Sequence, residues 1–315
     1  MAPEADLVPV TIIGGYLGAG KTTLLNRLLA GEHGRRLAIL VNDFGSVNID
    51  ADLIDTRDGE AVSLQNGCIC CSIADSLGDA LDQVLAFDPP PEQIVIEASG
   101  VADPAKIAHY GQGWPGCRLD AVVVLADAET IRTRARDEFV GELVVRQLAA
   151  ADVILLTKAD LVPAPVFEDV RSWVAERSRG SAPVVSVVAG RVEAAVVLDV
   201  EAGPRGSPSG GDGPQPGDRF ETATIGLDAP IAESVLRTVL GTWPDEVVRI
   251  KGIVQIADGD GSRVVVVHRV GRRSSIEPWP VDRPPPSERR LVVIGLAGSV
   301  EPALEEWERA LRDAG

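Results

Sequence analysis

The stretch IIGGYLGAGKTTLLNRLL, residues 12–29, joins an apolar run to a helical pattern through a glycine-rich turn. Within it, Gly15 to Thr22 matches the spacing G-x-x-x-x-G-K-[ST] between a strand and a helix. Glycines let backbone N–H groups turn inward, and the helix N-terminus adds positive potential. Lys21 can reach the β- and γ-phosphates of a nucleotide, and the Thr22 hydroxyl can ligate Mg²⁺. The stretch therefore predicts a phosphate site; the alternative, a turn with an incidental lysine, is disfavoured by this context.

Short apolar runs alternate with helical patterns through the first two-thirds of the chain. The runs are continuous, as in strands that are covered on both faces. This alternation predicts an α/β P-loop NTPase domain over residues 1–200, with a mostly parallel sheet between helices. We expect strands at residues 10–14, 37–41, 94–96, 121–126, 153–157 and 184–187, and helices at 22–30, near 72–85 and at 139–150.

A stretch rich in glycine, proline and serine follows this domain. Residues 202–218 read AGPRGSPSGGDGPQPGD, and they cannot bury enough apolar surface to order themselves. We therefore expect a flexible linker at 201–218 and a small α+β domain at 219–315. The second domain is expected to have strands at residues 220–226, 247–256, 264–270 and 291–296, and helices at 231–240 and 300–311.

The chain of 315 residues has a formal net charge of -17. Its length favours two domains, and a surface this acidic repels phosphate backbones, so we expect neither nucleic acid nor a membrane as partner. No run of 18 apolar residues is present, and the start MAPEADLVPV lacks the pattern of a secretory signal. Three of the four cysteines stand within four positions, a spacing that suits reduced thiols. We therefore predict a cytoplasmic protein.

A second motif, Thr157-Lys158-Ala159-Asp160, follows the apolar run at 153–157. A carboxylate at Asp160 can accept two N–H bonds from the Watson–Crick edge of guanine, whereas adenine would leave it facing an acceptor. The Lys158 stem can lie along the plane of the base. The motif is weak alone but strong after a phosphate loop, so it favours GTP over ATP.

Two acidic residues follow other predicted strands. Asp43 comes after the second strand and Glu97 after the third, and ligands of an open parallel sheet sit beyond the carboxyl ends of its strands. Asp43 is a candidate for contacting Mg²⁺ or orienting the attacking water, and Glu97 for the Mg²⁺ shell. With Lys21 they are the candidate catalytic residues, and Gly100 would let the backbone approach the γ-phosphate. Either acid could instead cap a helix.

The sequence NGCICC, residues 66–71, places Cys68, Cys70 and Cys71 just before a predicted helix. Thiols at a helix N-terminus have lowered pKa values and bind metal more readily. Three thiolates leave one tetrahedral position unfilled, which predicts an open, exchangeable site for Zn²⁺, with Co²⁺ as the alternative. The other interpretation is a group of small buried residues that caps the helix. Cys117 stands alone and is predicted to be a small core residue.

Together these residues resemble the P-loop GTPases of the CobW type from cobalamin biosynthesis, which are often described as metallochaperones. This family is close to the hydrogenase- and urease-maturation GTPases. The resemblance covers nearly the whole chain, and its motifs stand in the family's order. They are residues 15–23, NDFGSVNIDADLI at 42–54, NGCICC at 66–71, IEASGVADP at 96–104, TKADL at 157–161, WPDEVVRIKGIV at 243–254 and RRLVVIGL at 289–296.

The resemblance implies a GTP-hydrolysing carrier of zinc or cobalt that delivers the metal to a client metalloprotein, with the help of a CobW-type C-terminal domain. It implies that Cys68, Cys70 and Cys71 bind the metal and that the GTP state governs their hold. The nucleotide-binding residues that it implies are Gly15, Gly18, Ala19, Gly20, Lys21, Thr22, Thr23, Gly100, Thr157, Lys158 and Asp160.

The chain departs from the family in ways that leave questions open. Thr157 replaces the usual asparagine, which should cost little because Lys158 and Asp160 remain, and residues 207–218 lack the histidines that many members carry there. A zinc-stabilised regulatory GTPase that transfers no metal is one alternative function, and a P-loop kinase for a small molecule is another. The oligomeric state, monomer or homodimer, also stays open.

Overall fold

The computed structural model describes residues 7–30, 35–42, 61–64, 73–178, 182–198, 220–227, 229–258, 261–271, 273–279 and 289–314. The predictions for Asp43, for the three clustered cysteines and for the linker at 201–218 lie outside these residues. Leu7–Val200 forms one compact unit, and Glu201–Gly315 belongs to a second. Within the described part of the chain, no helix is long and apolar enough to cross a membrane.

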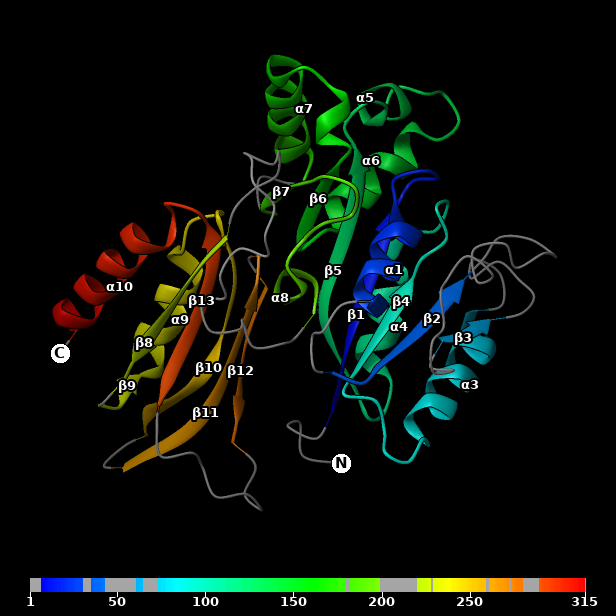
Figure 1. Cartoon of the computed structure of the whole chain (residues 1–315). Helices are drawn as coiled ribbons and strands as arrows, with labels where there is room; N and C mark the ends of the chain where they lie inside the picture. The colour runs from blue at the N-terminus through cyan, green and yellow to red at the C-terminus, as the bar shows by residue number, and fades with distance from the viewer. Residues whose placement is uncertain are drawn as a thin grey trace. The chain divides into compact units, whose positions relative to one another are not determined.

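A seven-stranded parallel sheet forms the centre of the first unit (Figure 1), in the order β3-β2-β4-β1-β5-β6-β7. The six predicted strands are confirmed. The extra strand, β3, escaped prediction because AVSL is too short to show a pattern. The strands are β1 (Val8–Gly15), β2 (Leu37–Asn42), β3 (Ala61–Leu64), β4 (Gln93–Glu97), β5 (Cys117–Asp127), β6 (Val153–Thr157) and β7 (Val184–Val187).

Helices pack on this sheet through aliphatic side chains. Val10 and Ile12 of β1 belong to one buried cluster with Leu81, Ile107 and Leu148 from three helices. Because side chains alternate across a strand, Thr11 and Ile13 face the other side of the sheet. The helices are α1 (Lys21–Ala30), α3 (Ile73–Leu85), α4 (Pro104–Gly113), α5 (Ile131–Arg134), α6 (Gly141–Ala150), α7 (Ala164–Arg177) and α8 (Ala194–Val197).

Two of the longer helices were not predicted. Helix α4 contains two glycines, and it depends on local signals at its start, where the Asp103 side chain accepts the Ala105 N–H at 3.0 Å and Pro104 occupies the first turn. Helix α7 buries only Val170 and Val174, so its apolar periodicity is weak. The predicted helix at 139–150 is confirmed but begins at Gly141.

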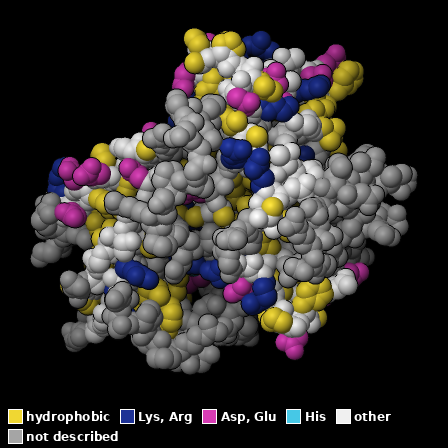
Figure 2. Space-filling view, in the orientation of Figure 1, with side chains coloured by type: hydrophobic (Ala, Val, Ile, Leu, Met, Phe, Trp, Pro, Cys, Tyr) yellow, Lys and Arg dark blue, Asp and Glu magenta, His cyan; other side chains and the backbone are white. Residues whose placement is uncertain are grey.

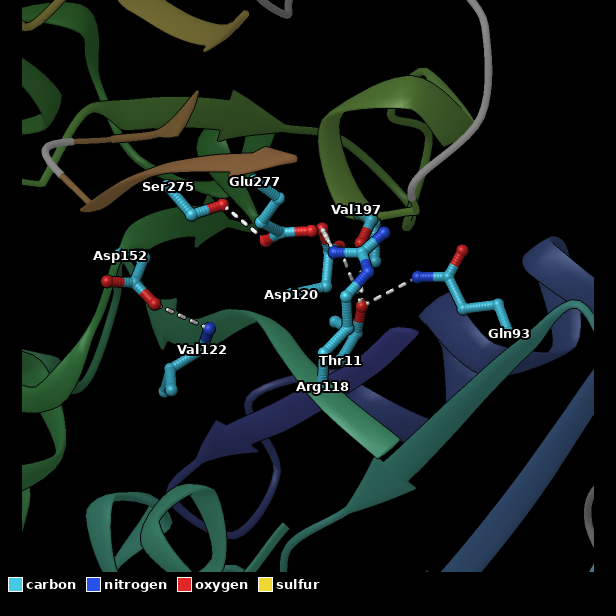
Figure 3. Close-up of polar contacts among 9 residues, drawn as sticks. All are labelled: Thr11, Gln93, Arg118, Asp120, Val122, Asp152, Val197, Ser275 and Glu277. Atoms are coloured by element: carbon cyan, nitrogen blue, oxygen red, sulfur yellow. Dashed lines mark hydrogen bonds and ion pairs between the residues drawn. The ribbon is translucent and has the colours of Figure 1, made fainter. Parts of the chain in front are cut away.

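A buried polar cluster lies on strands β1, β4 and β5 (Figure 3). The Thr11 hydroxyl accepts a hydrogen bond from Gln93 Nε2 at 2.8 Å. It also lies 3.3 Å from both Asp120 Oδ2 and the Val197 carbonyl oxygen, and donates to one of them. Since Thr11 and Gln93 are fully buried, these bonds offset the cost of their desolvation. The cluster therefore lies where the end of α8 contacts the sheet.

The second unit is an antiparallel sheet with two helices, so the α+β prediction is confirmed. The sheet order is β12-β11-β10-β13-β8, and β9 pairs with β10. Its elements are β8 (Phe220–Gly226), β9 (Ile231–Ala232), α9 (Glu233–Thr242), β10 (Val247–Asp258), β11 (Gly261–Val270), β12 (Arg273–Pro278), β13 (Arg290–Leu296) and α10 (Val300–Ala314). The start of the predicted helix at 231 was wrong, because Ile231 and Ala232 pair with β10 as a strand.

The second unit buries the charged side chain of Arg269, and also those of Arg249 and Glu277. The rings of Trp243 and Trp307 lie 5.7 Å apart between centroids. Arg269 is 1% exposed, and its Nη1 and Nη2 donate to the carbonyl oxygens of Val247 at 2.8 Å and Trp243 at 3.2 Å. The guanidinium therefore satisfies two buried backbone acceptors within this unit.

Acidic and basic side chains of the described residues are interspersed on the face that Figure 2 shows. Hydrophobic side chains there form small areas between them. On this face, the acidic side chains of the described residues therefore do not form a single patch, although the net charge of the chain is -17.

Candidate functional site

The phosphate loop connects β1 to α1 and depends on three glycines. Gly15 has φ +130°, and a Cβ there would collide with the carbonyl oxygen of Leu125, so only glycine lets β1 end against β5. Gly18 and Gly20 have φ values of +79° and +98°. Among the described residues, no heavy atom lies within 4 Å of a Cβ built at either position. Among the described residues, the space beside both glycines is therefore open.

Lys21 is the first residue of α1, directly after this loop. Its side chain is buried, and Nζ donates to the Gly15 carbonyl oxygen at 3.0 Å. Thr22 and Thr23 follow on the same helical turn, the first partly buried and the second exposed. The structure thus brings together the lysine, the two hydroxyls and the glycine turn, as the motif predicts.

Thr157 joins the T-K-A-D segment to the phosphate loop. It ends β6 and is buried, and its hydroxyl lies 2.9 Å from the carbonyl oxygen of Ala19 and 3.2 Å from that of Ala126. The hydroxyl has one proton to donate, and both acceptors lie within hydrogen-bond range. The threonine that replaces the family's asparagine therefore bonds directly to the loop that carries Lys21.

Lys158 and Asp160 occupy the turn that follows. Lys158 has φ 58° and ψ 34°, a left-handed conformation that costs a non-glycine residue roughly 1–2 kcal/mol. Its ammonium lies 2.7 Å from Asp127 Oδ2, at the end of β5. Asp160 lies in a short 3₁₀ helix, η2 (Ala159–Leu161), and is exposed. The turn therefore presents one carboxylate to solvent and holds one lysine against the sheet.

The end of β4 lies beside the phosphate loop. Glu97 is the last residue of this strand, is 3% exposed and pairs in register with Ile13 of β1. Three residues later, a Cβ on Gly100 would lie 2.8 Å from the backbone nitrogen of Leu17. The loop after β4 therefore packs closely against the phosphate loop, and this contact requires a glycine at position 100.

Gln147 of α6 is a residue that the sequence reasoning missed. Its side chain is 2% exposed, and Nε2 donates to the carbonyl oxygens of Gly100 at 3.1 Å and Ala102 at 2.8 Å. Both amide hydrogens are thereby used to hold the loop after β4. No pattern in the sequence marks a contact between residues 45 positions apart.

Asp127 was missed as well, although a signal existed. It ends an apolar run in the same way as Glu97, so the rule that selected Glu97 would also have found it.

A further loop at this edge follows β7. Ala189 and Gly190 have φ values of 49° and 70°. The Ala189 carbonyl oxygen accepts a hydrogen bond from Arg27 Nε, and a Cβ on Gly190 would lie 3.1 Å from Thr23 Cγ2. Segments after β1, β6 and β7 therefore meet around the first turns of α1, at the carboxyl ends of the parallel strands.

Helix α3, which follows the cysteine motif in the sequence, packs closely against the C-terminal part of α4. A Cβ on Gly78 would collide with the ring of Trp114 and lie 2.9 Å from the Tyr110 hydroxyl. The Trp114 indole donates to Asp82 Oδ1 at 3.0 Å. Helix α3 begins two residues after Cys71, and α4 begins four residues after Gly100.

The described residues contain no group of three or more His, Cys, Asp or Glu side chains that could hold a metal ion. Cys117, the one cysteine among them, is buried in the core, as predicted. Burial, and then the nearby charge of Asp82, raise the pKa of its thiol to about 12. This thiol therefore stays protonated at neutral pH and is a poor metal ligand.

Comparison with known proteins identifies relatives over most of the chain. The Pseudomonas aeruginosa protein named zinc chaperone CobW is 31% identical over 91% of this chain and 87% of its own length. The Escherichia coli protein named zinc chaperone YjiA is 30% identical over 92% of this chain and 94% of its own. The Schizosaccharomyces pombe protein named zinc-regulated GTPase metalloprotein activator 1 is 32% identical over 62% of this chain, which spans only 50% of that protein.

Family profiles match both parts of the chain. Residues 9–186 match the CobW/HypB/UreG nucleotide-binding domain, and residues 220–313 match the cobalamin synthesis protein CobW C-terminal domain. The first match covers nearly all of the parallel sheet and the loops described above except the one after β7, and the second covers the antiparallel sheet. The chain therefore belongs to the CobW/HypB/UreG family of P-loop GTPases, with a CobW-type C-terminal domain.

Proposed function

We propose that this protein is a GTP-hydrolysing metallochaperone that binds zinc and delivers it to a client metalloprotein. The observation that carries the nucleotide part is the hydrogen bond between the Thr157 hydroxyl and the Ala19 carbonyl, which joins the T-K-A-D turn to the phosphate loop. The names of the relatives support the metal part, since two are called zinc chaperones and one a metalloprotein activator.

In this proposal the segments at the carboxyl ends of the strands divide the recognition of GTP. Gly15, Gly18, Ala19, Gly20 and Thr23 line the phosphates, Lys21 contacts the β- and γ-phosphates, and Gly100 borders the γ-phosphate. Asp160 accepts the two N–H groups of the guanine edge, and the Lys158 stem covers the base plane. The Thr157 hydroxyl fixes the position of the T-K-A-D turn relative to the phosphate loop.

The residues proposed for hydrolysis are Lys21, Asp43 and Glu97. Thr22, Asp43 and Glu97 would hold Mg²⁺, which supplies charge neutralisation between the β- and γ-phosphates when bound. Glu97 is buried at a strand end, and Lys21 is buried at the start of α1. Such dry surroundings strengthen the interaction of a preorganised charge with the charge that develops in the transition state. Asp43 would orient the attacking water.

Cys68, Cys70 and Cys71 are proposed to bind the cargo, zinc or alternatively cobalt. The contact of Gly78 with Tyr110 and Trp114 supports a coupling between cargo and nucleotide. A γ-phosphate that displaces the Gly100 loop would displace α4, and with it α3, whose start lies next to the cysteines. A coupling of roughly 1–3 kcal/mol would change zinc affinity about 5- to 150-fold.

The test is zinc affinity, measured by competition with a chelator, in the presence of GDP and of a non-hydrolysable GTP analogue. We expect one zinc ion per chain, with affinities that differ between the two nucleotide states. Cys70→Ala should abolish tight binding, whereas the buried Cys117→Ala should bind as the unaltered protein does. Equal affinity in both nucleotide states would contradict the coupled chaperone.

A zinc-stabilised regulatory GTPase is the second function to separate. In that case chelation would unfold or inactivate the protein, since the metal would contribute to folding. We expect instead that zinc leaves while the circular dichroism spectrum and the melting temperature stay nearly unchanged. The cytoplasmic location and the choice between monomer and homodimer remain predictions.

A further inference from the structure

Asp127 holds two partners at the end of β5. Its side chain is 8% exposed, and Oδ1 accepts the backbone N–H of Glu129 at 2.9 Å. Oδ2 lies 2.7 Å from the Lys158 ammonium, whose side chain is 36% exposed. A fully exposed ion pair contributes about 0–1 kcal/mol, but here the carboxylate is nearly buried, and a buried charge left unpaired is costly. The pair therefore fixes the end of the lysine side chain.

The backbone around Lys158 is fixed as well. Its left-handed conformation follows Thr157, whose hydroxyl is bonded to the phosphate loop, and its carbonyl oxygen accepts the Leu161 N–H at 3.0 Å. A lysine stem is otherwise flexible and loses up to about 2 kcal/mol of rotamer entropy when it is immobilised. Held at both ends, this stem has already lost that freedom before any ligand binds.

We propose that Asp127 is a positioning residue for guanine recognition. It anchors the Lys158 ammonium so that the stem of this lysine forms a preformed wall for the plane of the base. This inference rests on the proposed guanine-nucleotide site, because Lys158 and Asp160 belong to the same turn. Asp127 itself touches no nucleotide and acts only through Lys158.

The variant Asp127→Asn tests this role, since asparagine keeps the size of the side chain and an oxygen for the Glu129 N–H but loses the charge. We expect GDP to bind about tenfold more weakly, the usual effect of losing one charge-assisted contact. Inosine diphosphate should weaken by the same factor, because the stem covers the base plane and does not read its edge. Binding of tripolyphosphate, which has no base, should not change.

Three further variants separate positioning from a structural role. In a Lys158→Ala background, Asp127→Asn should cause no additional loss of GDP affinity, because Asp127 acts only through the lysine side chain that this background lacks. Lys158→Met, which keeps a stem without an ammonium, should match Asp127→Asn. Asp79→Asn, an exposed aspartate of α3, should bind GDP as the unaltered protein does.

The inference is wrong if Asp127→Asn binds GDP normally, if its effect adds to that of Lys158→Ala, or if it weakens tripolyphosphate equally. Failure of the proposed function has a different signature. In that case the unaltered protein would not prefer GDP to ADP, whatever the variants do.

Discussion

The two units bury some of their polar side chains in different places. In the first unit, Lys21, Glu97, Asp127 and Thr157 are buried at the carboxyl ends of parallel strands. In the second unit, Arg269 is buried inside the sheet–helix core and donates to two backbone carbonyls of that core. Parallel strands end together at one edge and leave a place where polar groups can meet a ligand. A charged side chain buried in a core can form hydrogen bonds only with other groups of the protein.

This contrast predicts opposite phenotypes for buried cations in the two units. Lys21→Ala should lower kcat/KM for GTP about 10³-fold, because a preorganised charge on the phosphates is lost. The unfolding free energy should change by only about 1 kcal/mol, the usual net contribution of a hydrogen bond such as the one from Lys21 to Gly15. Steady-state hydrolysis and urea denaturation measure both effects. Lys106→Ala, at an exposed lysine of α4, is the control. An equal loss of GTP hydrolysis in Lys21→Ala and Lys106→Ala would contradict the contrast.

Arg269→Met should do the reverse. Methionine fills the volume but leaves the Val247 and Trp243 carbonyls without these donors, so we expect a loss of about 3 kcal/mol in unfolding free energy. The exposed Arg237→Met loses only its surface pair with Glu233 and should cost less than about 1 kcal/mol. A variant of Arg269 that keeps full stability but loses GTP turnover would place this arginine with the functional groups instead.

Gln147 tests whether the loop after β4 belongs to the functional edge. Gln147→Leu removes both donors from the Gly100 and Ala102 carbonyls, so the loop loses its anchor. We expect GTP hydrolysis to fall about tenfold, as for a loss of about 1.4 kcal/mol in the transition state. Stability should fall by about 1–3 kcal/mol, the desolvation cost of unsatisfied acceptors. Gln83→Leu on the exposed side of α3 is the matched control; unchanged hydrolysis in Gln147→Leu would limit this glutamine to a structural role.

Lys158 allows the smallest and sharpest comparison. Lys158→Gly should be as stable as Lys158→Ala or more stable, by up to about 1 kcal/mol, because glycine adopts φ 58° without strain. Both variants should bind GDP equally weakly, since both lack the stem. Thermal melting and equilibrium binding measure these two quantities. A glycine variant that is clearly less stable than the alanine variant would show that the turn carries no strain.

Local sequence patterns predicted the elements that carry the motifs. The strand at 153–157 was predicted with its observed bounds, because VILLT is short, continuous and apolar and ends at a polar residue. The turn at Lys21 and the segment at Thr157 were predicted from their motifs. The contact between them was not, because it joins a hydroxyl and a backbone carbonyl 138 residues apart.

The misses have physical causes of the same kind. Helix α7 buries only two valines, so its pattern is faint, and β3 has only four residues. Nothing in the sequence distinguishes Gln147 from other polar residues of a helix, because its role depends on the contact with the loop after β4. Partners that are distant in the chain are specified by the sheet topology, which a local pattern does not contain.

The most direct measurement is single-turnover hydrolysis of GTP at buffered free Zn²⁺, compared with the metal-free protein and with ATP. The account predicts a rate that is selective for GTP and that depends on zinc, since both motifs are proposed to act as one device. Equal rates with GTP and ATP would contradict the guanine site at Asp160. A GTP-selective rate that ignores zinc would contradict the coupling between the nucleotide and the cysteines.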